Sequence, residues 1–230
     1  MLAAPPDAAP NPWFDWSYVR DNADTILTAG EEHVILTVQT ILIGTVIALP
    51  LAVLASRVRW LAGPILGITG VLYTIPSLAL FAGLYPFVGF SRNLVLIGLV
   101  LYALLILVRN TLTGLRGVPD DVRDAALGMG YGRGRMFWRV ELPIAVPAIM
   151  TGVRTATVST IGLVTVGVIV GFGGFGQLIV VEGFNSNFHR APIVAGTLLC
   201  VALALVIDLA LILLTRILVP WARGREVAVS

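Results

Sequence analysis

Two charged side chains lie inside long apolar stretches, where a charge needs a partner or a function. Arg154 and Asp208 each lie about ten residues from one end of their stretch, which corresponds to roughly 15 Å at the helical rise of about 1.5 Å per residue. Charges inside membrane-spanning helices are usually paired or functional. We therefore predict an Arg154–Asp208 ion pair that holds two helices in register. The alternative is that one of the two lines a substrate path, where Asp208 could contact a cationic substrate.

A glycine pattern after the apolar residues 164–170 resembles a cofactor motif in spacing only. Gly171, Gly173 and Gly176 satisfy G-x-G-x-x-G, which binds dinucleotides when it joins a strand to a helix and an acid follows about 20 residues later. Here the preceding residues continue a stretch long enough to span a membrane, and the next acid, Glu182, is too close. We predict a glycine-rich turn at the outer end of that span.

Other side chains with catalytic or metal-binding chemistry are sparse. The chain has one cysteine, Cys200, and two histidines, His33 and His189, neither with a partner at metal-ligand spacing. It has no lysine and hence no Gly-x4-Gly-Lys-Ser/Thr phosphate-binding loop. We predict no catalytic residue, no metal and no bound cofactor. An intramembrane enzyme is disfavoured because only Arg154 and Asp208 offer polar groups at depth.

The composition predicts a membrane protein. Hydrophobic residues make up 57% of the chain and charged residues only 12%, against roughly 25% charged residues in soluble domains. The mean hydropathy is +0.93. The net charge of +2 gives no electrostatic basis for binding nucleic acid. Residues 1–11 contain no basic residue and no apolar stretch, so we expect no cleavable signal peptide.

Five segments are apolar enough for spanning helices of about 20 residues, so we predict an all-α polytopic protein. They are residues 34–56, 64–88, 93–108, 144–170 and 192–219. If the N-terminus is outside, eleven arginines fall on the inner side, in residues 57–59, 109–143 and 216–230, against Arg20, Arg92 and Arg190 outside. Basic residues favour the cytoplasmic side. The N-terminus is therefore expected outside and the C-terminus in the cytoplasm.

The second apolar segment is interrupted by proline. Pro76 removes a helical hydrogen bond, and it disfavours helix at the preceding residue. Interrupted helices at membrane depth occur where the backbone faces protein or a water-filled cavity. We predict that this segment lines a path through the membrane, with Tyr73, Thr74, Pro76, Ser77 and Phe81. A simple kink packed against another helix is the alternative.

The longest polar segment, residues 109–143, carries six arginines and four acids between two apolar helices. A loop of this length in a compact protein is usually functional. It reads Asp124-Ala125-Ala126-Leu127-Gly128-Met129-Gly130, then nine residues, then Val140-Glu141-Leu142-Pro143. Pro119, Asp120 and Asp121 favour a helix start. The alanines allow the helix to seat closely in a groove, and the glycines allow it to end.

This pattern resembles the EAA motif of ABC importer permeases. Asp124 stands where that family usually has glutamate, and Val140 where it usually has isoleucine, while the remaining spacing is kept. The resemblance implies a short coupling helix that docks into a cytoplasmic ATPase. The residues expected to couple are Asp124, Ala125, Ala126, Gly128, Met129, Gly130, Leu142 and Pro143. The alternative is an arginine-rich amphipathic helix on the lipid surface.

Residues 73–81, 109–111, 152–157 and 171–176 look like the corresponding segments of osmoprotectant permeases. The resemblance implies the type I importer fold and a bacterial cytoplasmic membrane location. It also implies ATP-driven import of glycine betaine, carnitine or choline. Methionine is the alternative solute, because methionine permeases share this plan. An ATP-independent transporter is the alternative class, but such transporters often have internal repeats, and none is evident here.

The same resemblance implies several partners. A separate ATPase would bind ATP and magnesium, and a separate extracytoplasmic protein would bind the substrate. Five helices are too few to enclose a path, so a second permease is expected, as a similar heterodimer partner or as an identical copy. We divide the chain into an extracytoplasmic tail with a candidate interfacial helix (1–31), a permease domain with its cytoplasmic coupling loop (32–219, loop 109–143) and a cytoplasmic tail (220–230).

Overall fold

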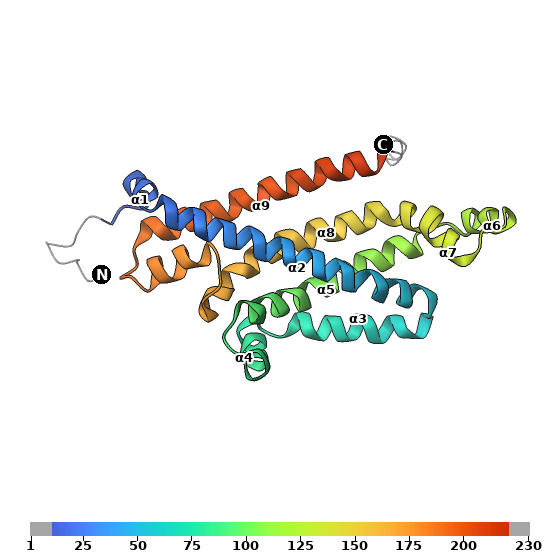
Figure 1. The fold of residues 1–230 in the computed structure, drawn as a ribbon, viewed down its shortest axis with the longest axis horizontal. Helices are drawn as coiled ribbons and strands as arrows, with labels where there is room; N and C mark the ends of the chain where they lie inside the picture. Colours follow the sequence, from blue (N-terminus) through green and yellow to red (C-terminus); the bar gives the residue numbers. More distant parts are fainter. Residues whose placement is uncertain (1–10, 221–230) are drawn as a thin grey trace, which may run out of the picture.

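The computed structural model describes residues 11–220, and every regular element in this range is helical (Figure 1). Residues 1–10 of the predicted N-terminal tail, and all but the first residue of the predicted cytoplasmic tail, lie outside the described residues. The elements are α1 (Trp16–Asp21), α2 (Ala23–Arg57), α3 (Arg59–Thr74), α4 (Ser77–Val88), α5 (Arg92–Arg116), α6 (Asp120–Gly128), α7 (Arg133–Met136), the π-helix η1 (Phe137–Glu141), α8 (Leu142–Val164), the 3₁₀-helix η2 (Thr165–Val170), the π-helix η3 (Gln177–Phe184) and α9 (Arg190–Leu218).

Four helical stretches between residues 11 and 220 are long and apolar enough to cross a membrane. They are α2, α5, the continuous stretch from α7 through η2, and α9. The pair α3 and α4 gives a fifth if the two helices count as one broken span. The all-α fold is therefore confirmed, and four of the five predicted segments coincide with helices that could cross a membrane, while the fifth, residues 64–88, falls on the broken pair.

Three predicted boundaries were wrong. The second segment is not one continuous helix, because α3 and α4 meet at a bend of 102° next to Pro76. The third helix continues to Arg116, so Arg109 lies within α5 and the polar connection begins only at Gly117. At the N-terminal end, the expected interfacial helix corresponds at most to the short α1, and α2 already begins at Ala23, within the predicted tail.

The bundle is organised around α5, which packs against α2, α8, α3 and α4. Small residues allow these close approaches. A Cβ added to Gly114 would lie 2.9 Å from the Ala145 carbonyl oxygen of α8, and one added to Gly98 would lie 2.5 Å from the Phe81 ring of α4. Close packing through small residues is how helices associate in lipid, where the hydrophobic effect gives no preference for helix contact. Figure 1 places α6 and α7 at one end of this bundle, called the α6 end, and α1 at the other, called the α1 end.

The predicted glycine-rich turn is present at the α1 end. It follows η2, with Gly171 at φ +88° and Gly174 at φ +51°, both in the left-handed region that favours glycine. Residues of α2 hold this turn. Glu32 Oε2 accepts a hydrogen bond from the Gly174 N–H at 3.1 Å, and His33 Nδ1 accepts one from the Phe175 N–H at 3.3 Å.

His33, in α2, is fully buried. Its Nε2 lies 3.0 Å from the Ile161 carbonyl oxygen of α8. Because Nδ1 accepts a hydrogen bond from Phe175, the neutral ring carries its proton on Nε2 and donates it to Ile161. This imidazole therefore joins α2, α8 and the glycine turn.

Candidate coupling site

The helix α6 at the α6 end begins and ends as its sequence predicts. Asp120 and Asp121 lie in its first turn, where acids stabilise the positive end of the helix dipole. At its other end, the Gly130 N–H bonds the Leu127 carbonyl at 2.9 Å and the Tyr131 N–H bonds the Ala126 carbonyl at 3.0 Å. This pair of bonds is the Schellman motif, which needs a left-handed residue. Gly130 supplies it with φ +78°.

The predicted coupling residues separate into two groups in the structure. Exposed residues of α6 and the turn after it are Asp124, Ala125, Gly128, Met129 and Gly130. Ala126 is instead buried inside the loop, and Leu142 and Pro143 lie half-buried in the first turn of α8. A Cβ added to Gly128 would meet nothing within 4 Å. Gly128 therefore leaves the outer surface of α6 without a protruding side chain at this position. Of the two glycines, only Gly130 adopts the left-handed conformation that ends the helix.

Large apolar side chains are exposed at the α6 end. Leu127 is 58% exposed and Met129 66% exposed, and both lie beside the exposed Ala125 and Gly128. Trp138, in η1 nearby, is 65% exposed. These are exposed apolar groups on an otherwise polar, arginine-rich connection. They lie next to small residues, an arrangement that is compatible with docking into a groove.

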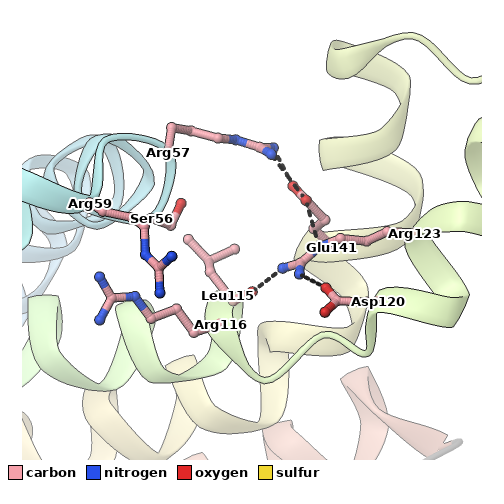
Figure 2. A pocket seen from close by; sticks show the side chains of 8 residues that line it. All are labelled: Ser56, Arg57, Arg59, Leu115, Arg116, Asp120, Arg123 and Glu141. Atoms are coloured by element: carbon pink, nitrogen blue, oxygen red, sulfur yellow. Dashed lines mark hydrogen bonds and ion pairs between the residues drawn. The ribbon is translucent and has the colours of Figure 1, made fainter.

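A buried carboxylate joins α6 to the helices of the bundle (Figure 2). Glu141, in η1, is 3% exposed and accepts hydrogen bonds from both terminal nitrogens of Arg57, at the end of α2. Arg123 of α6 donates from Nε to Glu141 Oε1 at 3.3 Å. A buried charge is tolerated when it is paired and hydrogen-bonded. The Glu141 carboxylate therefore connects α2, α6 and the start of α8.

Arg123 makes two further contacts that fix the base of α6. It donates to Asp120 Oδ1 at 2.9 Å and to the Leu115 carbonyl oxygen at 2.9 Å. The second contact bridges the connection between α5 and α6. Arg123 thus joins α6 to the end of α5 as well as to Glu141.

These residues surround a cavity of about 720 Å³. Its lining is Ser56, Arg57, Arg59, Leu115, Arg116, Asp120, Arg123 and Glu141, all drawn in Figure 2. The roles of Arg57, Arg123 and Glu141 were not predicted from the sequence. The sequence offered one indication: Glu141 stands directly before an apolar helix and at the end of an arginine-rich connection, where a buried acid would find an arginine partner.

Arg154 and Asp208 lie together in the structure. Arg154 donates from Nε to Asp208 Oδ1 and from Nη2 to Asp208 Oδ2, both at 2.9 Å. This two-bond geometry is the strong form of an arginine–carboxylate pair. The side chains are 36% and 29% exposed. The pair joins α8 to α9, whose apolar surface is otherwise widely exposed beyond its first turns.

The residues predicted to line a path lie around the bend between α3 and α4. Tyr73 and Thr74 line a groove of about 510 Å³ together with Arg109 of α5; the other lining residues are Leu66, Gly70, Val71 and Leu105. The Tyr102 hydroxyl donates to the Ile75 carbonyl oxygen at the break.

The remaining predicted path residues lie beside this groove or away from it. Pro76 and Ser77 are the residues at which α4 begins, and they are not among the residues that line the groove. Phe81 is 3% exposed and packs on Gly98, so it faces the core. Between residues 11 and 220, no three His, Cys, Asp or Glu side chains are grouped in a way that could hold a metal ion.

Comparison with known proteins agrees with this geometry. The family model described as "Binding-protein-dependent transport system inner membrane component" matches residues 41–224. The glycine betaine/carnitine/choline transport system permease protein OpuCD of Bacillus subtilis (strain 168) is 35% identical over 204 residues, which cover 89% of each chain. The osmoprotectant import permease protein OsmW of Salmonella typhimurium is 36% identical over 212 residues, which cover 88% of this chain and 96% of that protein.

Solved structures show the same fold. A chain of the MetNI methionine ABC transporter, in an inward-facing conformation, superposes with a TM-score of 0.75 at 21% identity, over 84% of this chain and 95% of that one. The family match covers most of the chain and includes the α6 end with its exposed apolar surface. This chain therefore belongs to the binding-protein-dependent transport system inner membrane components, as a multi-pass permease subunit of an ABC importer.

Proposed function

We propose that this permease imports quaternary ammonium osmoprotectants, driven by a separate cytoplasmic ATPase that docks on α6. The observation that carries the proposal is the exposed apolar surface of α6, held to α2 and α8 through the buried Glu141. The solute class rests on relatives that are named as glycine betaine, carnitine, choline and osmoprotectant permeases.

In this mechanism the ATPase binds ATP and magnesium, and the chain transmits its motion. Closure of the ATPases displaces α6, and Arg123 passes the displacement to Glu141 and so to α2 and α8. The Arg154–Asp208 pair carries it on to α9. Charge-assisted hydrogen bonds between helices transmit such a displacement from one helix to the next. The bundle would then switch as a unit between two arrangements.

The path itself needs a second permease, because the four or five candidate spans between residues 11 and 220 are too few to enclose one. We favour a similar heterodimer partner over an identical copy. A separate extracytoplasmic protein delivers the substrate. The groove with Tyr73 and Arg109 suits a zwitterion, because the ring attracts a quaternary ammonium and the guanidinium pairs with a carboxylate. Glycine betaine and carnitine carry both groups, whereas choline lacks the carboxylate.

The test is reconstitution of the permease in proteoliposomes with its ATPase, second permease and binding protein. Uptake of labelled glycine betaine, carnitine, choline and methionine is measured with and without ATP. We expect ATP-dependent uptake of the quaternary ammonium compounds. Uptake that persists without ATP would show an ATP-independent transporter, and uptake of methionine alone would overturn the solute class.

The docking surface is tested separately by exchanging Met129. Met129→Asp places a charge on the exposed apolar surface, and we expect the ATPase no longer to co-purify. Met129→Leu keeps an apolar side chain of similar size and serves as the matched control. Equal recovery of the ATPase with both variants would contradict the proposal that the ATPase docks on α6.

A further inference from the structure

The cavity at the α6 end carries more positive charge than its acids balance. Four arginines and two acids line it. Glu141 pairs with Arg57 and Arg123, and Asp120 pairs with Arg123. Within residues 11–220, no acid lies at ion-pair distance from Arg59 or Arg116. The positive charges of Arg59 and Arg116 therefore line the same cavity without an acid to balance them.

These two arginines come from different helices. Arg59 is the first residue of α3, and Arg116 is the last residue of α5, with one 3.3 Å bond from its Nη2 to the Ala55 carbonyl oxygen. Figure 2 shows both side chains on the side of the cavity away from Glu141. The beginning of α3 adds the positive end of a 16-residue helix dipole. An anion between the two guanidiniums removes their repulsion, and the planar forks match the oxygens of a phosphate.

The neighbouring residues place this cavity at the level of lipid headgroups. Trp60 follows Arg59 and is 74% exposed, and tryptophan is enriched at the membrane–water interface. Further along α3, Ile68 and Val71 are each 64% exposed, which suits contact with acyl chains. Basic pockets between spanning helices at this depth bind anionic headgroups.

We propose that Arg59 and Arg116 form a binding site for a phosphate group, supplied by an anionic phospholipid of the leaflet at the α6 end. The bound phosphate links the start of α3 to the end of α5, directly before the connection to α6. It thereby stiffens the base from which α6 projects. The site is independent of which solute the permease carries.

The experiment measures lipid retained by the purified permease–ATPase complex with native mass spectrometry, after exchange into phosphatidylglycerol or phosphatidylcholine. We expect retention of phosphatidylglycerol over phosphatidylcholine. In Arg59→Gln/Arg116→Gln it falls about tenfold or more, because each basic residue near an anionic membrane contributes about 1 kcal/mol. Arg133→Gln/Arg139→Gln removes the same charge from exposed positions at the same end and keeps the retention.

A second arm distinguishes the sources of phosphate. Thermal unfolding of the complex in detergent is followed during titration with inorganic phosphate or with phosphatidylglycerol. Stabilisation by the lipid alone assigns the site to a headgroup, whereas equal stabilisation by inorganic phosphate assigns it to a free phosphate ion. Both effects must disappear in the double variant. The single variant Arg59→Gln, at an exposed position, repeats the test without disturbing the fold.

Two results would overturn the proposal. The first is equal retention of both lipids by the native complex and the double variant, with no stabilisation by phosphate. The second is loss of the ATPase from the double variant in every lipid, which would show that these arginines face an acidic surface of the ATPase.

Discussion

The Glu141 carboxylate and the Arg57 guanidinium, 84 residues apart in the chain, form a two-bond ion pair at the α6 end. Glu141 is buried, whereas the Arg57 side chain is 46% exposed. The carboxylate therefore depends on its partners more than they depend on it. The pair joins the end of α2 to η1, the π-helix that leads into α8 and packs next to α6.

Glu141→Gln should uncouple ATP hydrolysis from transport. Removing the carboxylate charge leaves Arg57 and Arg123 facing a neutral amide, at a cost of about 1–3 kcal/mol for a lost buried hydrogen-bonded charge. We expect substrate-stimulated ATPase activity of the reconstituted complex to fall toward its unstimulated level. Asp120→Asn is the matched control, because the Asp120 side chain is 91% exposed. Loss of coupling in both variants alike would contradict a special role for Glu141.

Gly130 and Gly128 should respond oppositely to alanine. Gly130→Ala forces a side chain into the left-handed region at φ +78°, which costs about 1–2 kcal/mol. Gly128→Ala lies in helix with open space around it, and alanine there favours the helix by about 1 kcal/mol. The midpoint temperature of thermal unfolding should therefore fall only for Gly130→Ala.

Gly128→Ala should instead weaken ATPase association, because its methyl group raises the outer surface of α6. Co-purification from the same preparations measures this. If Gly128→Ala binds the ATPase as well as the native chain does, the close contact at Gly128 is absent.

The Arg154–Asp208 pair should behave as a unit. Asp208→Asn and Arg154→Gln are each expected to reduce assembly of the complex, since each leaves one partner charged at membrane depth. The combined variant is expected to recover assembly, which size-exclusion chromatography of the complex measures. A double variant no better than the single ones would instead favour a direct role of one residue in the path.

The groove between α3 and α5 should discriminate among solutes. Arg109→Gln should reduce uptake of glycine betaine and carnitine more than uptake of choline, because only the first two carry a carboxylate. Tyr73→Ala should reduce all three, and Tyr73→Phe should restore them because an aromatic ring remains. A uniform loss in Arg109→Gln would point to a structural role for that arginine.

Alkaline pH should loosen α1. Burial and a hydrogen bond to Glu182 raise the pKa of Tyr18 above its ordinary value of 10. Because the folded protein favours the neutral phenol, the contact contributes its full stability below about pH 10 and loses it as the pH rises above that value. The protection factors of the amides of residues 16–21, which are exchange rates corrected for the base-catalysed rate of an unfolded chain, should therefore fall above pH 10 in the native chain. In Tyr18→Phe this fall should be absent, and a fall of equal size there would exclude Tyr18.

The sequence determined the elements that depend on local pattern and on the lipid. Stretches of apolar residues fixed five membrane segments, because backbone groups in lipid must bond within a helix. Pro76 and the acids before Asp124 marked a break and a helix start. Arg154 and Asp208 could be paired from depth alone, since two charges inside spans have few available partners.

The tertiary structure decided which faces these elements present. Only the three-dimensional packing turns Ala126 inward and Ala125 outward, and brings Glu141 to Arg57 and Arg123. Only the packing buries Phe81 on Gly98 and brings His33 to the glycine turn. Local propensity determines where a helix begins and ends, whereas its rotation and its contacts with distant residues depend on the packing of the whole bundle. The helix α6 was therefore predictable from its sequence pattern, but the buried carboxylate that joins it to the bundle was not.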